Sequence, residues 1–329
     1  MTQALRIVIP DVGREPGHGG ARWAVLQYVI GLRRLGHEVV LASSGRTSRI
    51  EADLALNISG RITSEALAHV PIRAYLDLDP GFNQLWQEQG ITSGFEDHTN
   101  FVTVGLAVGQ PGCDVPTTGR RWFSTLPPVV LDRWPVVHAI ETDAFTTVAN
   151  FRSYGSIDRF GVHYGQKVHS LRKLMDLPTR VKRRFVLAMR VHDNEKADLD
   201  ALRENRWELV DPCMVAATPE RYRRFVSRSR AEIGIAKSGY VASRCGWFSD
   251  RSVCYLASGR PVVAQETGFS RFLPTGEGLL VFADTSGAVD AIERVDSDYA
   301  RHARAARRIA EEHFDSDRVL TRLIEAVST

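Results

Sequence analysis

The chain has 329 residues, of which 43% are hydrophobic and 25% are charged. Because domains usually hold about 150 residues, this length predicts two domains, each with its own hydrophobic core. The 42 basic and 39 acidic residues leave a net charge of only +3, from which we expect no nucleic-acid partner.

The four cysteines lack the paired spacing that is typical of structural zinc sites and disulfide frameworks. No segment predicts a signal peptide, and no run of apolar residues approaches the roughly twenty that cross a bilayer. We therefore expect reduced thiols, a cytoplasmic location and no integral membrane association.

The first forty residues predict a strand, a helix and a second strand. Residues 6–9 are a short apolar strand, residues 13–20 a glycine-rich loop, and residues 23–35 place apolar side chains on one helical face before Gly36 ends the helix. The next strand is expected at residues 38–42. Further strands at 54–57, 73–77 and 101–104 predict a mostly parallel sheet, and the proline pairs of residues 111–135 predict an extended loop over a cleft.

The second half of the chain again alternates between strands and helices. Glycine-rich residues 155–165 separate it from the first half, so we expect an N-terminal domain at residues 1–160, a C-terminal domain at 161–312 and a terminal helix at 313–329. Strands are predicted at 185–189, 207–210, 232–236, 261–264 and 279–282, and helices at 219–229, 250–257, 286–294, 298–312 and 316–326.

Residues 243–270 are the most informative segment, because they predict a loop, a helix, a tight turn, a buried strand and a second loop. A helix that starts near Ser249 presents free backbone N–H groups and the positive end of its dipole, which favour phosphate. Arg251 can add charge and Ser252 a hydroxyl donor. The segment therefore predicts a phosphate-binding site.

The helix of this segment ends in a small-x-Gly-x-Pro-Val-Val motif, and with the N-terminal glycine loop it resembles the two half-sites of GT-B glycosyltransferases. The resemblance covers nearly the whole chain and is nearest to the bacterial spore-coat glycosyltransferase-like group. It implies an α/β protein of two Rossmann-like domains facing each other across a cleft. It also implies an acceptor on the N-terminal side, a nucleotide sugar on the C-terminal side, and a last helix that packs back on the N-terminal domain.

The sequence departs from two known patterns of this family. The paired glutamates of many retaining members correspond to Gly246 and Cys254, so their roles are not carried over. The segment Arg-Cys-Gly-Trp-Phe-Ser is instead similar to His-Cys-Gly-Trp-Asn-Ser of inverting plant-type transferases, with Arg244 at the position of the histidine. The stereochemical course, the base, the sugar and the acceptor stay open.

The resemblance implies transfer of a sugar from a nucleoside-diphosphate sugar, as co-substrate, to an unidentified acceptor. GT-B enzymes stabilise the leaving diphosphate with basic side chains and a helix N-terminus, so we expect no metal and no cofactor. Asp77 and Asp79 alternate at the end of a strand, where a carboxylate that caps the turn or serves the acceptor is expected rather than a metal pair. The expected donor-binding residues are Gly19, Gly20, Lys167, Arg190, Arg244, Ser249, Asp250, Arg251, Ser252, Glu266, Thr267, Gly268 and Phe269.

An inverting transferase also needs a general base for the acceptor hydroxyl. The candidates are Asp79, His98 and His18, which lie at strand ends or in the glycine loop of the first half. Two other functions stay open: a nucleotide-sugar epimerase, and an inactive transferase-like scaffold that binds without turnover. The oligomeric state is also left open.

Overall fold

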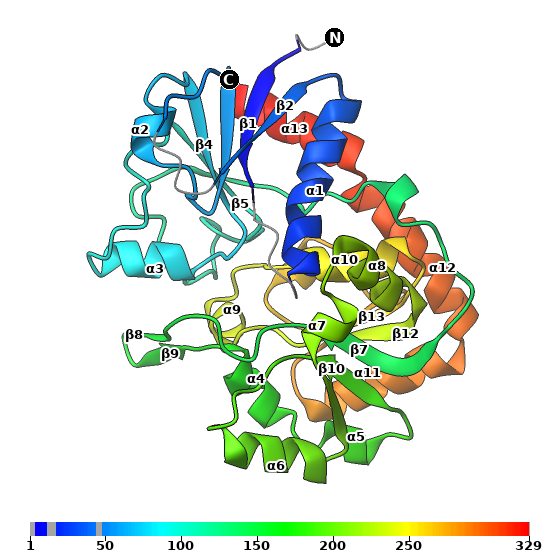
Figure 1. Ribbon diagram of the computed structural model, residues 1–329. Coiled ribbons are helices and arrows are strands. Elements are labelled where there is room, and N and C mark those ends of the chain that lie inside the picture. Colours follow the sequence, from blue (N-terminus) through cyan, green and yellow to red (C-terminus); the bar gives the residue numbers. More distant parts are fainter. Residues whose placement is uncertain (1–3, 12–17, 44–47, 329) are drawn as a thin grey trace.

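The computed structural model describes residues 4–11, 18–43 and 48–328, and its N-terminal part is built on a parallel six-stranded sheet (Figure 1). All five strand positions expected there are occupied by strands, and a sixth follows at the sheet edge. The strand order is β2 (Glu38–Ala42), β1 (Arg6–Pro10), β3 (Leu54–Ile58), β4 (Ile72–Asp77), β5 (Asn100–Thr103) and β6 (Trp122–Ser124). The helices of this part are α1 (Gly19–Arg34), α2 (Ser64–Leu67) and α3 (Phe82–Glu88).

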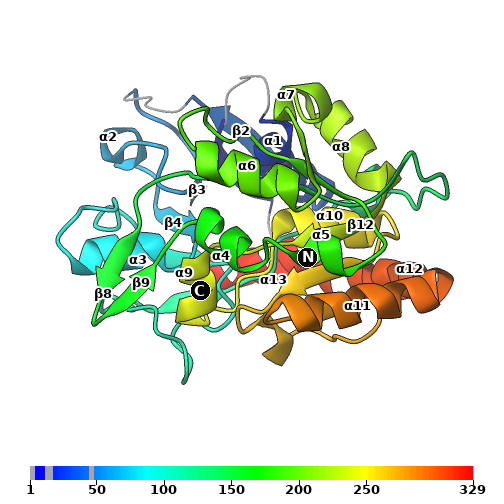
Figure 2. The same ribbon diagram turned by 90° about the horizontal axis from the view of Figure 1, so that it is seen from below.

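The second parallel sheet also has six strands, in the order β11 (Trp207–Val210), β10 (Phe185–Ala188), β7 (Thr142–Val148), β12 (Ser229–Gly234), β13 (Val262–Gln265) and β14 (Leu279–Phe282). Its helices are α4 (Lys167–Lys173), α5 (Leu177–Arg180), α6 (Lys196–Glu204), α7 (Pro212–Val215), α8 (Pro219–Arg228), α9 (Ser238–Ser243), α10 (Asp250–Ala257), α11 (Thr285–Ser297) and α12 (Tyr299–Ile309). Figure 2 shows α11 and α12 side by side along one flank of this sheet.

The position of β7 corrects the boundary expected at residue 160. β7 pairs with β10 on one side and with β12 on the other, so it lies inside the second sheet. The chain therefore passes between the two sheets within residues 125–141. The segment 155–165 that suggested a boundary instead contains an antiparallel hairpin of β8 (Ile157–Arg159) and β9 (Val162–Tyr164), with Gly161 in its turn.

The segment 111–135 is also more structured than the extended loop that its prolines predict. It contains the edge strand β6 and a short 3₁₀ turn, η1 (Leu131–Arg133). The prolines after β6 prevent a longer strand because proline has no N–H to donate to the sheet.

The last helix, α13 (Ser316–Ser328), follows a π-helical turn, η3 (Ala310–Phe314), and lies beside α1 (Figure 1). Leu320, Leu323 and Ile324 share a core cluster with Val25 and Val29 of α1. A Cβ atom on Gly31 of α1 would come within 2.4 Å of the Leu320 side chain, so a larger residue there would force Leu320 to shift. The chain thus begins and ends in the N-terminal domain.

Close backbone contacts hold the two domains together. The Gly19 N–H donates to the Ala216 carbonyl at 2.8 Å. A Cβ atom on Gly246 would lie 2.7 Å from the Ala107 nitrogen, and Gly105 forms an isolated bridge with Trp247. Within the described residues, no helix has both the length and the apolar character needed to cross a bilayer.

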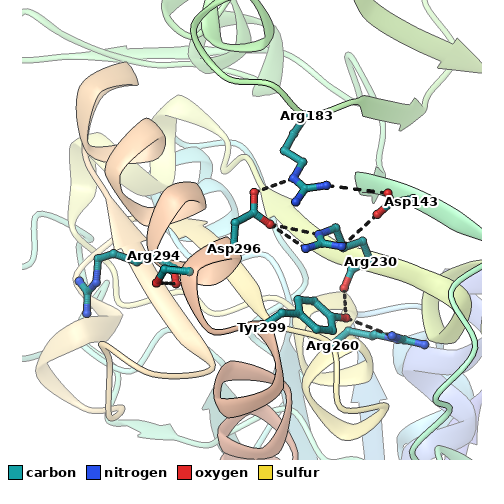
Figure 3. Close-up of polar contacts among 8 residues, drawn as sticks. Asp143, Arg183, Arg230, Arg260, Arg294, Asp296 and Tyr299 are labelled. Atoms are coloured by element: carbon teal, nitrogen blue, oxygen red, sulfur yellow. Dashed lines mark hydrogen bonds and ion pairs between the residues drawn. The ribbon is translucent and has the colours of Figure 1, made fainter.

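A charged network lies at the amino ends of the strands of the second sheet, away from the cleft (Figure 3). Arg183, just before β10, and Arg230, near the start of β12, both bind Asp296 of α11, at 2.6 Å and 2.8 Å. Asp143 at the start of β7 pairs with Arg230 at 3.1 Å. Because the carboxyl ends of parallel strands face the other way, this network supports the fold and leaves the cleft edge for ligands.

Candidate active site

Two connected cavities lie in the cleft. The first has a volume of about 400 Å³ and receives residues from both domains, and the second, of about 510 Å³, shares His18, Asn150 and Pro212 with it. Loops from the carboxyl ends of β4, β7 and β12 reach the first cavity, which is the usual ligand position in open α/β sheets. The polar side chains that line it include His18, Asp79, Asn150, Tyr154, Lys167, Lys237, Ser249, Asp250 and Arg251.

Asp79 lies in the first cavity and pairs across the cleft with Lys237, which follows β12. The Lys237 Nζ is 2.9 Å from Asp79 Oδ1 and 2.7 Å from Oδ2, and the side chains are only 14% and 29% exposed. The Tyr154 hydroxyl donates to Asp79 Oδ2 and accepts from Lys237. The Lys237 ammonium also lies 4.0 Å from the centre of the Tyr154 ring. Three separate segments thus meet at one carboxylate.

Asp77 has a different environment from Asp79. Its carboxylate is buried and accepts from Gln84 Nε2 at 2.8 Å, from Thr103 Oγ1 at 3.1 Å and from the Asp79 N–H at 3.0 Å. Burial raises the pKa of Asp77 to about 6, although these hydrogen bonds act in the opposite direction. Asp77 therefore organises the turn after β4. Within the described part of the chain, no group of three or more His, Cys, Asp or Glu side chains is placed to hold a metal ion.

The N-terminus of α10 faces the first cavity. Ser249 caps the helix by accepting the Arg251 N–H at 3.2 Å, and Ser249, Asp250 and Arg251 all line the cavity. The Arg251 guanidinium is largely buried, where it pairs with Glu232 and donates to the Val148 carbonyl at 2.9 Å. The Ser252 side chain is buried and does not line either cavity.

Lys167, the first residue of α4, adds a third cation to the first cavity, after Lys237 and Arg251. Its side chain is buried, and its ammonium donates to the Ile235 carbonyl. Burial lowers the pKa of Lys167 well below its usual value, and the charges of Arg251 and Lys237 lower it further. Because these three cations repel one another, an anion bound among them would be stabilised.

The N-terminus of α1 forms the other wall. His18 lines both cavities and Gly20 lines the first. Gly19 packs against the backbone of the other domain and leaves no room for the nucleotide sugar, because a Cβ atom there would lie 2.5 Å from the Thr218 carbonyl oxygen. The rest of the predicted glycine loop, residues 13–17, lies outside the described residues.

The second cavity contains Arg190, which pairs with Asp211 at 3.2 Å. It also contains His192 and Arg152. Arg244 lines neither cavity, because its backbone is left-handed, with φ of 50°, and its guanidinium is 3.3 Å from the Asp114 carboxylate.

The loop after β13 was expected to contact the sugar, but none of its four residues lines either cavity. Glu266 accepts the Gly268 N–H, and the Thr267 hydroxyl donates to the Trp247 carbonyl at 2.6 Å. Phe269 packs on Phe248, with 5.1 Å between ring centres. The loop instead supports residues 245–248. Of these, Trp247 lines the first cavity.

The structure does not bring His98 to the cleft. His98 Nε2 is 3.0 Å from Asn57 Nδ2, and the ring packs edge-on against Tyr75 at 5.2 Å. Burial lowers the pKa of His98. Because His98 precedes β5, it lies near the amino end of that strand, whereas the cleft is at the carboxyl end.

Sequence analysis missed Lys237, Tyr154 and Asn150 in the first cavity. Lys237 gave a usable signal, because it directly follows a buried strand in a chain with lysine at only five positions, Lys167, Lys173, Lys182, Lys196 and Lys237. Tyr154 gave none, since it directly precedes the glycine-containing segment that was taken for a domain boundary.

Comparison with known proteins agrees with this architecture. Residues 179–325 match a family model described as glycosyl transferase-like. The whole chain superposes on an alpha-glucosyltransferase solved with UDP-glucose and DNA containing an abasic site, with a TM-score of 0.66, 12% identity, and coverage of 99% of this chain and 100% of that one. The chain has the GT-B fold. None of the curated proteins matches it in sequence.

Two further GT-B structures match over nearly their whole length. They are Anabaena HepE with UDP-glucose, with a TM-score of 0.61, 13% identity, and coverage of 98% and 99%, and sucrose-phosphate synthase from Thermosynechococcus elongatus, with a TM-score of 0.59, 13% identity, and coverage of 98% for both chains. The two-domain GT-B architecture expected from the two half-sites is therefore confirmed.

The exclusion of nucleic acid as a partner was wrong. Alpha-glucosyltransferases that match the full length of this chain in fold were solved in complex with DNA. A net charge of +3 averages over the whole molecule. It therefore says nothing about a basic surface on one element.

Proposed function

We propose that this chain is a glycosyltransferase that moves a sugar from a nucleoside-diphosphate sugar to an acceptor. The observation that supports this most is the meeting of Lys167, Lys237, Arg251 and the N-terminus of α10 around one cavity. A leaving diphosphate develops negative charge, which such a set of fixed positive groups stabilises. Asp79, on the opposite wall, is our proposed base for the acceptor hydroxyl.

The donor that we propose is a UDP-sugar, supported by the UDP and UDP-glucose complexes of proteins with this fold. The acceptor that we propose is carried by a nucleic acid, supported by the DNA complexes of the alpha-glucosyltransferases. A cytoplasmic location, kinship with the spore-coat group and hexosyl specificity stay predictions.

The test of this function is incubation of the protein with UDP-glucose, with and without duplex DNA, followed by mass spectrometry of nucleotide and DNA. Transfer gives UDP and a DNA mass increased by one sugar. A changed sugar nucleotide without an acceptor would indicate an epimerase, and binding without any product would indicate a scaffold.

Lys167→Met should weaken UDP binding by about 1.5–3 kcal/mol, the range for hydrogen bonds to charged groups. Methionine has a similar length and is readily buried, so we expect the fold to be retained. Isothermal titration calorimetry measures the change. Lys173→Met, on the exposed side of the same helix, is the matched control and should bind UDP normally. Equal affinity in both variants would contradict the assignment of Lys167.

Arg251→Ala is a less direct test of the same site, because it leaves the buried Glu232 carboxylate without its partner. Breaking such a buried pair destabilises a protein by about 3–5 kcal/mol. Loss of UDP binding in that variant would therefore not separate a donor contact from unfolding.

We also propose that turnover requires no metal and no cofactor. Both Asp79 oxygens contact Lys237, and Asp77 is occupied by its hydrogen bonds to the turn. UDP release from UDP-glucose should therefore stay within about twofold after EDTA treatment and dialysis, since basic groups replace the metal. If EDTA abolished turnover and magnesium restored it, Asp77 and Asp79 would become the leading ligands.

A further inference from the structure

The segment of α7 and α8 has one face on the cleft and another that is exposed. Pro212 and Tyr222 line the cleft on its inner face. Tyr222 and Val226 are buried, so the helical period turns the arginines of α8 outward. We define the basic surface as Arg221, Arg223, Arg224 and Arg228 of α8. Its Arg221 end adjoins Tyr222 at the wall of the candidate active site, and its Arg228 end reaches Glu141, just before the start of β7.

This surface borders a hollow of about 370 Å³. The hollow is lined by Glu141, Thr142, Met214, Val215, Arg221, Arg224, Phe225 and Arg228. Its three arginines, at positions 221, 224 and 228, are three and four residues apart and so lie along one side of α8. They therefore extend over about 10 Å along the helix axis, at roughly 1.5 Å per residue.

The arginines of the hollow outnumber the carboxylates that oppose them. Glu141 alone pairs with both Arg224, at 3.1 Å, and Arg228. The Arg224 side chain stays 69% exposed in that pair. Within residues 4–11, 18–43 and 48–328, no acidic side chain pairs with the exposed Arg221 guanidinium. The hollow therefore keeps an excess of positive charge.

We propose that this basic surface binds the phosphodiester backbone of a nucleic acid and presents a neighbouring nucleotide to the cleft. Guanidinium groups bind phosphate oxygens in a bidentate fork, and a row of them fits the repeated charges of a nucleic-acid backbone. The role in presenting an acceptor rests on the proposed transferase function, whereas backbone binding does not. A lipid surface fits less well, because the arginines surround a hollow instead of a protruding apolar face.

The test compares two double variants by fluorescence anisotropy with a short labelled DNA duplex, over about 50–200 mM salt. Arg221→Ser with Arg224→Ser removes two proposed phosphate contacts. Arg203→Ser with Arg301→Ser changes the net charge equally at two exposed positions elsewhere, where the side chains are 70% and 59% exposed. Thermal unfolding of each variant checks that it is folded.

We expect the α8 variant to bind DNA about tenfold more weakly at the lower salt, and the slope of log affinity against log salt to decrease by about 2. The control should retain both values. Absence of salt-dependent DNA binding, or an equal loss in the control, would overturn the proposal. So would α8-dependent binding to phosphatidylserine vesicles without binding to DNA.

UDP titration of the same proteins separates this proposal from the function of the cleft. The α8 variant should bind UDP as the wild type does, because none of the substituted residues lines the first cavity. If the wild type bound DNA but no UDP, the donor site would be wrong and the basic surface would stand.

Discussion

Asp79→Asn should lower the rate of sugar transfer by about 100-fold or more, while UDP affinity changes little. Asparagine keeps the shape of the side chain but cannot take a proton, and general base catalysis contributes about 10²–10⁴-fold. Asp79 lines the first cavity and is held by Lys237 and Tyr154, so its carboxylate has a defined position. Single-turnover kinetics with UDP-glucose and the acceptor measures the loss, and calorimetry measures UDP binding.

His98→Ala is the comparison variant for this experiment. Both residues are base candidates in the sequence, but His98 contacts Asn57 and Tyr75 away from the cleft. We therefore expect a transfer rate within about twofold of the wild type, as for residues that do not contact the reacting groups. A normal rate in Asp79→Asn would remove Asp79 as the base and leave His18, which lines both cavities, as the next candidate.

Arg260→Met should lower the free energy of unfolding by about 3 kcal/mol or more, because buried acceptors lose their donors at roughly 1–3 kcal/mol each. The Arg260 side chain is buried just before β13. It donates to the carbonyl oxygens of Ser227 at 2.8 Å, Val137 at 2.6 Å and Ala139 at 2.7 Å, and to the Tyr299 hydroxyl at 3.0 Å. It thereby fixes the connection between the domains to the second sheet. Figure 3 shows its contact with Tyr299.

Urea unfolding followed by fluorescence measures this change. The control is Arg203→Met, because Arg203 is 70% exposed and pairs with Asp200 on the surface, where such pairs contribute about 0–1 kcal/mol. A midpoint for Arg260→Met equal to that of the control would show that water satisfies the three carbonyl groups.

Arg260 belongs to the small-x-Gly-x-Pro-Val-Val motif, on which the sequence argument for the donor site depended. In the structure this part of the motif has an architectural role. Gly259 has a φ of 70° and ends the turn after α10, and Arg260 anchors the turn to the interdomain connection. Residues 266–269 likewise have an architectural role, because they support the loop around Trp247.

The amino-acid sequence by itself predicted most strands of both sheets, although not β6, and the resemblance of its two half-sites to a known family implied the GT-B architecture. The parallel strands of each sheet are short apolar runs with recognisable breaks, and Ser249 marks the start of α10 by its own side chain. These features depend on neighbours within a few residues, so periodicity and capping predict them.

Only the tertiary structure decided which polar residues meet in the cleft. Asp79, Tyr154 and Lys237 are separated by 75 and 83 positions, and no local pattern encodes their distance in space. The domain boundary failed for the same reason, since β7 is assigned to the second sheet only by its pairing with β10 and β12. Contacts between distant segments depend on how the sheets pack, and a pattern of neighbouring residues carries no record of that packing.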